Sequence, residues 1–288
     1  MPARSPLGRW LAACLAICAA VSSACVPVTR PVVKIGLVAP FEGRYRDVGY
    51  EVIYAVRLAV REANAAGGVA GYSIELFALD DSGDPAMAVT QAHKLAADPQ
   101  VVGAIGHWLD ETTLAAAPAY AESGIPLLAT TAAPALDPSA FRLWPGEQAL
   151  QAELPAVREA AAGPLGWGET PFFTPGGSNT MRLLAPAPMP ADSADPGFAA
   201  RFRAISNGVQ PNAYSVLAYD ATRLLLDALS HADTRGAVGA PVRAAEAATL
   251  RQTEYRGLSG AISFNAQRQW GQAQWRAYGY QDGRVTPP

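Results

Sequence analysis

The sequence predicts an α/β protein built on a parallel β-sheet, and three observations carry this prediction. Residues 32–38 (VVKIGLV) form a nearly continuous apolar run, typical of a strand that is buried on both faces. Residues 50–65 carry apolar side chains at helical spacing on one face, with Arg57 and Arg61 outside it. Strand-like and helix-like segments then alternate with short connections, which predicts a doubly wound sheet with helices on both of its faces.

The other expected elements follow in chain order. Gly67 and Gly68 end the first helix, because glycine readily adopts the left-handed conformation that stops a helix. Up to Phe141 the pattern predicts strands at 72–79, 101–105 and 125–129, and helices at 85–97 and 111–123. Beyond Phe141 the pattern is weaker, and it predicts a helix at 147–162, at most one short strand within 163–179, a strand within 181–188, helices at 197–205 and 213–230, and short strands over 258–284.

The first 24 residues are predicted to be a secretory signal peptide. Arg4 and Arg9 precede an apolar run at residues 10–21 that is too short to span a membrane. The following SSAC resembles a bacterial lipoprotein processing box, which makes Cys25 the expected lipidated first residue of the mature chain; plain secretion with cleavage nearby is the alternative. All three cysteines lie within the first 25 residues: Cys14, Cys18 and Cys25.

Composition narrows the class of protein further. Half of the 288 residues are apolar and 16% are charged, which indicates a globular chain. Removal of Arg4 and Arg9 with the leader takes the formal net charge from −3 to −5. The sequence has no basic run, so nucleic acid is not an expected partner. It offers no serine in a G-x-S-x-G turn and no cysteine outside the leader, so we expect no enzyme, and we expect no cofactor or metal.

Four loops are expected at one edge of the sheet. Open parallel sheets bind ligands in the crevice at the carboxyl ends of their strands. The loops that reach this edge are residues 39–49, 80–85, 106–113 and 130–134. A ligand site is therefore expected there.

Several segments, in this order and spacing, resemble the type I periplasmic solute-binding proteins, specifically the branched-chain amino-acid-binding group of ABC importers. The segments that carry the resemblance are VKIGLVAPFEG, REANAAGGVAGYSIEL, DDSGDPAMAVTQAHKLAAD, VVGAIGH, ESGIPLLATTAAPAL, AYDATRLLLDAL and YRGLSGAISFNAQRQWGQAQWRAYGYQDGR. The resemblance implies two doubly wound parallel-sheet lobes joined by a hinge, with a small-molecule ligand held between them. It also implies ABC permease and ATPase subunits as partners, and a place outside the cytoplasm on the membrane through the N-terminal lipid.

The resemblance implies a division of the chain in which the second lobe is reduced. After the signal peptide (1–24) and a lipid-anchor tether (25–31), lobe 1 covers 32–141 with about 212–258 returning to it, and lobe 2 covers 142–211 with about 259–288. Two or three strands of the family's second lobe have no counterpart. The expected function is a substrate-binding lipoprotein for a solute of amino-acid or amide type; the alternative is a ligand-sensing or assembly module that kept lobe 1 and lost transport.

The expected ligand contacts lie in the crevice loops. They are Tyr45, His107, Asp110, Glu111, Thr112, Thr130, Thr131 and Ala132. Asp110 has two open roles, as a ligand contact and as the N-cap of the helix that it precedes. The acids Asp80, Asp81 and Asp84 lack the spacing of a calcium loop, and Asp84 before Pro85 is expected to be a cap.

These roles lead to an expectation about ligand charge. If Asp110 caps its own helix, it uses the free N–H groups there, and together with Glu111 it leaves negative charge facing the crevice. A neutral or cationic solute is then preferred, unless Arg44 or Arg46 swings in and restores anion binding. Alanine at Asp110, Thr112 or Thr131 should weaken binding, whereas Asp81→Ala should be nearly silent. Trp108 and Trp144 are expected to serve mainly in packing.

Overall fold

The computed structural model describes residues 30–131, 133, 136–145, 172–175, 181–234, 236–281 and 284–286. Residues 32–288 form one unit by their contacts, and residues 1–31 form another. Among the described residues, no helix has both the length and the apolar character that crossing a membrane requires. The helix expected at 147–162 and the lipidation site Cys25 lie outside the described residues.

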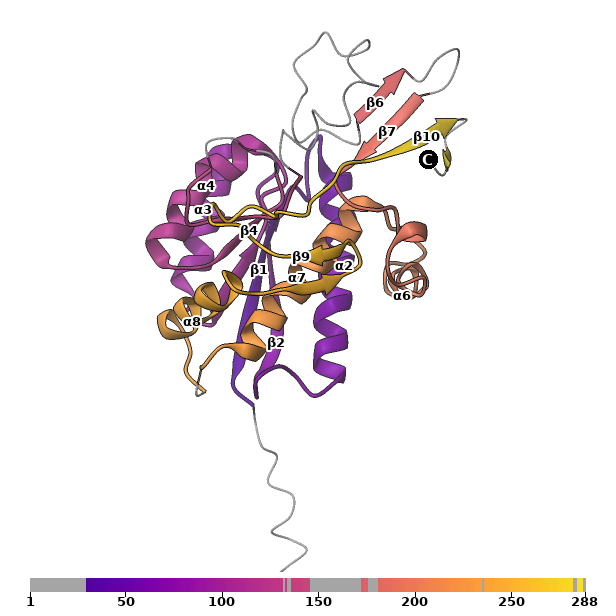
Figure 1. Ribbon diagram of the computed structural model, residues 1–288. Coiled ribbons are helices and arrows are strands. Elements are labelled where there is room, and N and C mark those ends of the chain that lie inside the picture. Colours follow the sequence, from indigo (N-terminus) through magenta and orange to yellow (C-terminus); the bar gives the residue numbers. More distant parts are fainter. Residues whose placement is uncertain are drawn as a thin grey trace, which may run out of the picture. The chain divides into compact units, whose positions relative to one another are not determined.

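A five-stranded parallel sheet forms the centre of this unit (Figure 1). Its strands are β1 (Val32–Ala39), β2 (Ser73–Asp80), β3 (Val101–Ile105), β4 (Leu127–Ala129) and β5 (Phe141–Arg142). Their order, β2-β1-β3-β4-β5, places β1 beside both β2 and β3 and is a doubly wound topology. The predicted parallel sheet is therefore confirmed, and each predicted strand lies within two residues of its observed bounds at either end.

Two helix layers cover the sheet. The layer of α3 (Pro85–Ala97) and α4 (Asp110–Ser123) packs against Val38 of β1, and the layer of α2 (Arg46–Ala65) and α7 (Ala213–His231) packs against Val33, Ile35 and Leu37. This division follows from the strand, whose successive side chains point to opposite faces. Gly67 and Gly68, with φ of 104° and 84°, follow α2 as predicted.

One helix of this unit was not predicted, α8 (Ala240–Leu250). Its weak apolar pattern is explained by two buried charged side chains, Arg243 and Glu246. Arg243 donates Nε to the Val101 carbonyl at 2.8 Å and Nη2 to the Asp98 carbonyl at 2.8 Å. The guanidinium thus fastens α8 to the start of β3 by using carbonyl acceptors in place of an apolar contact.

The described strands outside the central sheet pair antiparallel, so the expectation of a second parallel sheet is wrong for them. Four of them form one sheet in the order β11-β10-β7-β6: β6 (Phe172–Pro175), β7 (Met181–Ala185), β10 (Arg276–Gln281) and β11 (Arg284–Thr286). The connections explain two of the three pairings: residues 176–180 join β6 to β7 and residues 282–283 join β10 to β11. A parallel pair needs a crossover of a dozen residues or more, which these connections cannot provide.

The remaining elements are short. A 3-10 turn, η2 (Pro190–Asp192), precedes α6 (Phe198–Ile205), and a hairpin of β8 (Tyr255–Gly257) and β9 (Gly260–Ile262) follows α8. Arg201 of α6 bonds Glu62 of α2 and Asp195, each at 2.8 Å. Phe202 packs edge-on against Tyr54. These contacts attach the segment around α6 to α2.

Candidate functional site

The register of the central sheet brings the ends of its strands together at one edge. Ala39 at the end of β1 pairs with Asp80 at the end of β2, and Leu37 pairs with Ile105 at the end of β3. Ala129 at the end of β4 pairs with Arg142 of β5. The loops that follow these strands therefore start side by side, as expected for a ligand crevice.

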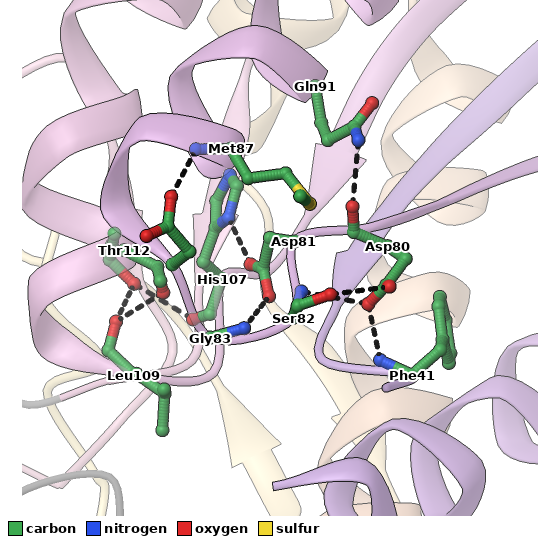
Figure 2. Close-up of polar contacts among 12 residues, drawn as sticks. Phe41, Asp80, Asp81, Ser82, Gly83, Met87, Gln91, His107, Leu109 and Thr112 are labelled. Atoms are coloured by element: carbon green, nitrogen blue, oxygen red, sulfur yellow. Dashed lines mark hydrogen bonds and ion pairs between the residues drawn. The ribbon is translucent and has the colours of Figure 1, made fainter. Parts of the chain in front are cut away.

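The acids after β2 are structural. Asp80 Oδ1 accepts from the N–H of Phe41 at 2.7 Å and of Ser82 at 2.8 Å, which ties the loop after β1 to the turn after β2 (Figure 2). Burial acts to raise the pKa of Asp80, but the hydrogen bonds from Ser82 and Phe41 outweigh it, and the pKa falls below its usual value. Asp84 caps α3 by accepting from Met87 N–H at 2.7 Å, as predicted, with Pro85 as the first helical residue.

Asp81 and His107 contact each other (Figure 2) and are the first two members of a buried polar chain that continues to Tyr120. Asp81 Oδ2 lies 2.7 Å from His107 Nδ1, and His107 Nε2 lies 3.1 Å from the Tyr120 hydroxyl. Burial, and then the charge of Asp81, raise the pKa of Tyr120, so the phenol keeps its proton and donates it to Nε2. Nδ1 then carries the ring proton that Asp81 accepts. Both nitrogens of His107 are used within the protein, which does not support the expected ligand contact.

The expectation that Asp110 caps its own helix is wrong. Leu109 is the N-cap residue of α4, and its own side chain makes no cap hydrogen bond. Asp110 Oδ1 instead accepts from the N–H of Ala133, at 3.1 Å, and Arg142 Nη2 donates to the carbonyl of the same residue. Arg142 also interacts electrostatically with Asp110. A guanidinium outside the four loops therefore offsets the carboxylate, and the premise for a neutral or cationic ligand fails.

The threonines of the crevice loops differ in what their hydroxyls do. Thr112 Oγ1 donates to the Leu109 carbonyl at 3.0 Å, and Thr130 Oγ1 donates to the His107 carbonyl at 3.4 Å. Thr131 is equally buried, but its Oγ1 has no hydrogen-bond partner among the described residues. Of the three, Thr131 therefore has the hydroxyl with unused bonding capacity.

The other expected contacts occupy varied positions. Tyr45 is the N-cap residue of α2 and is half-buried, with its ring against Gly83. Glu111 is exposed in the first turn of α4. Ala132 lies outside the described residues. The structure thus brings the described members of the expected set to one edge, with His107 turned inward.

Sequence reasoning missed an aromatic cluster at the same edge. Trp108 follows β3 and lies edge-on to Tyr214 of α7, with ring centroids 6.2 Å apart. Trp144 follows β5 and stacks on the same ring at 6.4 Å, while Trp275 meets Trp144 edge-on at 5.6 Å. Trp108 and Trp144 were expected near the crevice from the sequence. Nothing in the sequence placed Tyr214 between them, because it lies 70 positions further along the chain than Trp144.

A carboxyl group stands beside this cluster. Burial raises the pKa of Glu51 to about 7, against a hydrogen bond from Asn212 that lowers it. Burial and the charge of Glu51 in turn raise the pKa of Tyr214.

Asn212 caps α7 by accepting from Tyr214 N–H at 2.9 Å, in a capping box with Ser215. The start of α7 is therefore fixed at the edge where the crevice loops begin.

Comparison with known proteins supports the resemblance seen in the sequence. Residues 32–150 match the family model of periplasmic binding proteins. An amino acid binding protein of Pseudomonas aeruginosa is 32% identical over 93 residues, 32% of this chain and 25% of the relative. A Leu/Ile/Val-binding protein homolog of Brucella abortus is 34% identical over 97 residues, 34% of this chain and 26% of the relative. The match thus spans about a quarter of the length of these curated relatives.

Solved structures match over most of the chain. An ABC transporter substrate-binding protein from Desulfitobacterium hafniense, in complex with Leu, has a TM-score of 0.68 and 18% identity, and the match covers 88% of this chain and 99% of that one. A substrate-binding periplasmic protein from Ralstonia solanacearum has a TM-score of 0.72 and 15% identity, with 89% and 100% covered. The chain therefore has the fold of the type I periplasmic binding proteins, which confirms the predicted fold class except for the antiparallel pairing of the described strands outside the central sheet. The matched proteins are described as binding proteins and not as enzymes.

Proposed function

We propose that this protein is the extracytoplasmic substrate-binding component of an ABC importer and binds a small solute of amino-acid or amide type. The observation that carries the proposal is the gathering of buried polar groups at the carboxyl edge of the sheet, where Thr131, Arg142 and the N-terminus of α4 meet. Ligands of open α/β sheets bind at this edge. The match of residues 32–150 to the periplasmic binding protein family and the similarity to amino-acid-binding relatives support a solute of the same class.

The proposal includes a lipid anchor. Cys25 is the proposed mature N-terminus, and residues 25–31 are the tether between the lipid and lobe 1. The support for this part is the SSAC box and the apolar run before it. The permease and ATPase subunits of the importer are the proposed protein partners.

One observation favours a second function, a ligand-sensing or assembly module without transport. Domain closure in binding proteins needs a second lobe that moves about a hinge. Here α6, which lies in the proposed second lobe, is attached to α2 through Arg201, Glu62 and Phe202. A protein with this attachment could hold a solute on lobe 1 and signal its presence without closing.

A thermal-shift screen tests whether the protein binds a solute at all. The purified protein is heated with amino acids, their amides, polyamines and small sugars, and a compound present at 100 times its dissociation constant adds about 2.7 kcal/mol to the unfolding free energy. Stabilisation by an amino acid or an amide supports the proposal, and its absence across the screen contradicts it. Stimulation of the importer ATPase by the bound protein in proteoliposomes then separates transport from sensing: transport requires stimulation, and the sensing function predicts none.

A further inference from the structure

A cavity of about 490 Å³ lies at the amino edge of the central sheet, between the end of α4 and α8. Ile125 and Pro126, which directly precede β4, form part of its wall. The crevice loops begin at the other ends of the strands, so this cavity is separate from the candidate crevice. Its volume is within the range of cavities that hold small organic molecules.

Two arginines line this cavity. Arg268 is held in place, because its Nη1 donates to the Ser139 carbonyl and its guanidinium lies over the Phe141 ring, 5.1 Å from the centroid. Arg251 directly follows α8 and is exposed, and no hydrogen bond or ion pair joins it to another described residue. One guanidinium is therefore fixed at the cavity, and the other is available to a ligand.

The two guanidiniums are close enough to influence each other. Burial, and then the charge of Arg251, lower the pKa of Arg268, while Asp137 acts in the opposite direction. Repulsion between two cations that line one cavity costs free energy, and an anion between them would relieve it. Among the described residues of the lining, the two arginines stand against one carboxylate, that of exposed Glu122. The charge of the lining therefore favours an anion.

The donors of the lining match a phosphate group better than a carboxylate. A guanidinium presents a fork of N–H groups that bonds carboxylate or phosphate oxygens in pairs. The Ser139 hydroxyl is a further donor at the cavity, and it has no hydrogen-bond partner among the described residues. A phosphate monoester brings a charge of about −1.5 to −2 and three acceptor oxygens, whereas a carboxylate brings one charge and two oxygens.

The rest of the wall accommodates a short organic body. Three alanines of α8 line the cavity along one helix face: Ala240, Ala244 and Ala247. Small side chains at this spacing leave room beside the helix, and their methyl groups offer an apolar surface. A ligand with a phosphate at one end and a few carbon atoms at the other therefore fits both parts of the wall.

We propose that Arg251, Arg268 and Ser139 form a second ligand site, which binds the phosphate group of a small phosphate monoester. The site lies at the opposite edge of the sheet from the proposed solute site, so neither proposal depends on the other. A free solute and a lipid headgroup can both present such a phosphate group, and the test separates these two sources.

Calorimetry with glycerol phosphate, and with glycerol as the matched neutral compound, tests the site. We expect glycerol phosphate to bind and glycerol not to bind. Arg251→Gln should weaken binding by about tenfold, because it removes one charged donor. Arg256→Gln is the matched control, since Arg256 is an exposed arginine of β8 outside the cavity lining, and it should bind like the unsubstituted protein. Glu122→Gln should strengthen binding by about twofold to fivefold, because it removes the opposing charge.

Vesicles distinguish a lipid headgroup from a free solute. In a second arm, phosphatidylcholine vesicles with and without phosphatidic acid replace glycerol phosphate, and Cys25→Ser protein is used so that the proposed lipid anchor does not contribute. Binding in either arm that Arg251→Gln weakens supports the site and identifies the source of the phosphate. Binding in neither arm overturns the site.

Two further outcomes also overturn the site. An equal effect of Arg251→Gln and Arg256→Gln would show that only the overall charge of the protein matters. Amide resonances of the unsubstituted protein provide a measurement that needs no variant: saturating glycerol phosphate should shift those of residues 122–125 and 247–251. Unchanged resonances in both segments contradict binding at this cavity.

Discussion

The Nδ1 atom of His107 lies 2.7 Å from Oδ2 of Asp81, and neither side chain has exposed surface. Asp81 also accepts from the Gly83 N–H at 2.9 Å. This pair connects the turn after β2 with the loop after β3, two of the loops that border the candidate crevice (Figure 2). The pair therefore supports the crevice without belonging to its surface.

Asp81→Ala is predicted to destabilise the protein, whereas its near-silent effect expected from the sequence concerned ligand binding. The substitution leaves the buried Nδ1 of His107 and the N–H of half-buried Gly83 without their acceptor, which should lower the unfolding free energy by about 2–4 kcal/mol. Urea unfolding measures it. Asp84→Ala is the control, since it removes only the cap of α3 and should cost about 1 kcal/mol. An equal decrease in unfolding free energy for the two variants would show that the buried Asp81–His107 pair stabilises the protein no more than a helix cap does.

Gly257→Ala is predicted to destabilise the hairpin that packs on α7. A Cβ at this position would lie 2.4 Å from Asp220 Oδ1, and Asp220 is buried while it accepts from the Leu258 and Ser259 N–H groups at 2.7 Å each. The clash cannot be relieved without disturbing these bonds, so we expect a loss of about 1–3 kcal/mol in unfolding free energy.

Gly271→Ala provides the control for Gly257, because a Cβ at Gly271 meets no atom within 4 Å. Its unfolding free energy should stay within about 0.5 kcal/mol of the parent value. If Gly257→Ala is as well tolerated as Gly271→Ala, the close approach of Gly257 to Asp220 is not a feature of the folded protein.

Glu246 predicts a pH dependence of stability. Its carboxyl is fully buried on α8 near Gly103, both oxygens lack a hydrogen-bond partner among the described residues, and burial raises its pKa from 4.5 to about 8. A raised acid pKa in the folded state means that its contribution is fully present below pH 4.5 and is lost as the pH rises through 8. Between pH 4.5 and 8, ionisation of Glu246 should lower the unfolding free energy of the parent by up to about 1.4 kcal/mol per pH unit. Glu246→Gln should abolish this part of the decrease.

The measurement for Glu246 is the unfolding free energy at a series of pH values between 5 and 9 (about one unit apart), for the parent and for Glu246→Gln. The parent curve should fall more steeply than that of the variant. Parallel curves would show that Glu246 does not carry the buried proton inferred from its surroundings.

Sequence reasoning predicted the parts of the fold that are dominated by local pattern. The buried run of β1, the paired glycines after α2 and the Asp84–Pro85 start of α3 each have a signal within a few residues. The helix α8 was missed because Arg243 and Glu246 interrupt its apolar face. The buried guanidinium is acceptable there because it bonds carbonyls that are distant in the chain, those of Val101, Asp98 and Ser123 among them.

The candidate site was predicted less completely, because its partners are far apart in the chain. The loops were placed at the right edge by strand alternation alone. That Asp110 bonds the Ala133 N–H, and that Tyr214 stands between Trp108 and Trp144, depends on tertiary contacts which no local pattern encodes. Burial of His107 depends in the same way on Asp81 and on Tyr120 of α4.

Cys25→Ser tests the proposed anchor. The thiol of Cys25 is the proposed lipid attachment point, so its replacement by a hydroxyl should move the protein from the membrane fraction to the soluble extracytoplasmic fraction. Cys18→Ser, within the apolar part of the leader, should leave the protein on the membrane. Membrane association that survives Cys25→Ser would contradict lipidation at this residue.

The central claim is that a small solute binds at the carboxyl edge of the central sheet, and hydrogen–deuterium exchange with the best compound of the thermal-shift screen tests it most directly. We expect the solute to slow exchange in residues 106–113, which follow β3, and in residues 128–133, which include the end of β4 and the loop after it. Elsewhere on the same unit, a concave surface of about 470 Å³ is lined by Asp227, His231 and Glu254, among other residues. Protection confined to that surface beside α8, with unchanged exchange at the sheet edge, would contradict the account.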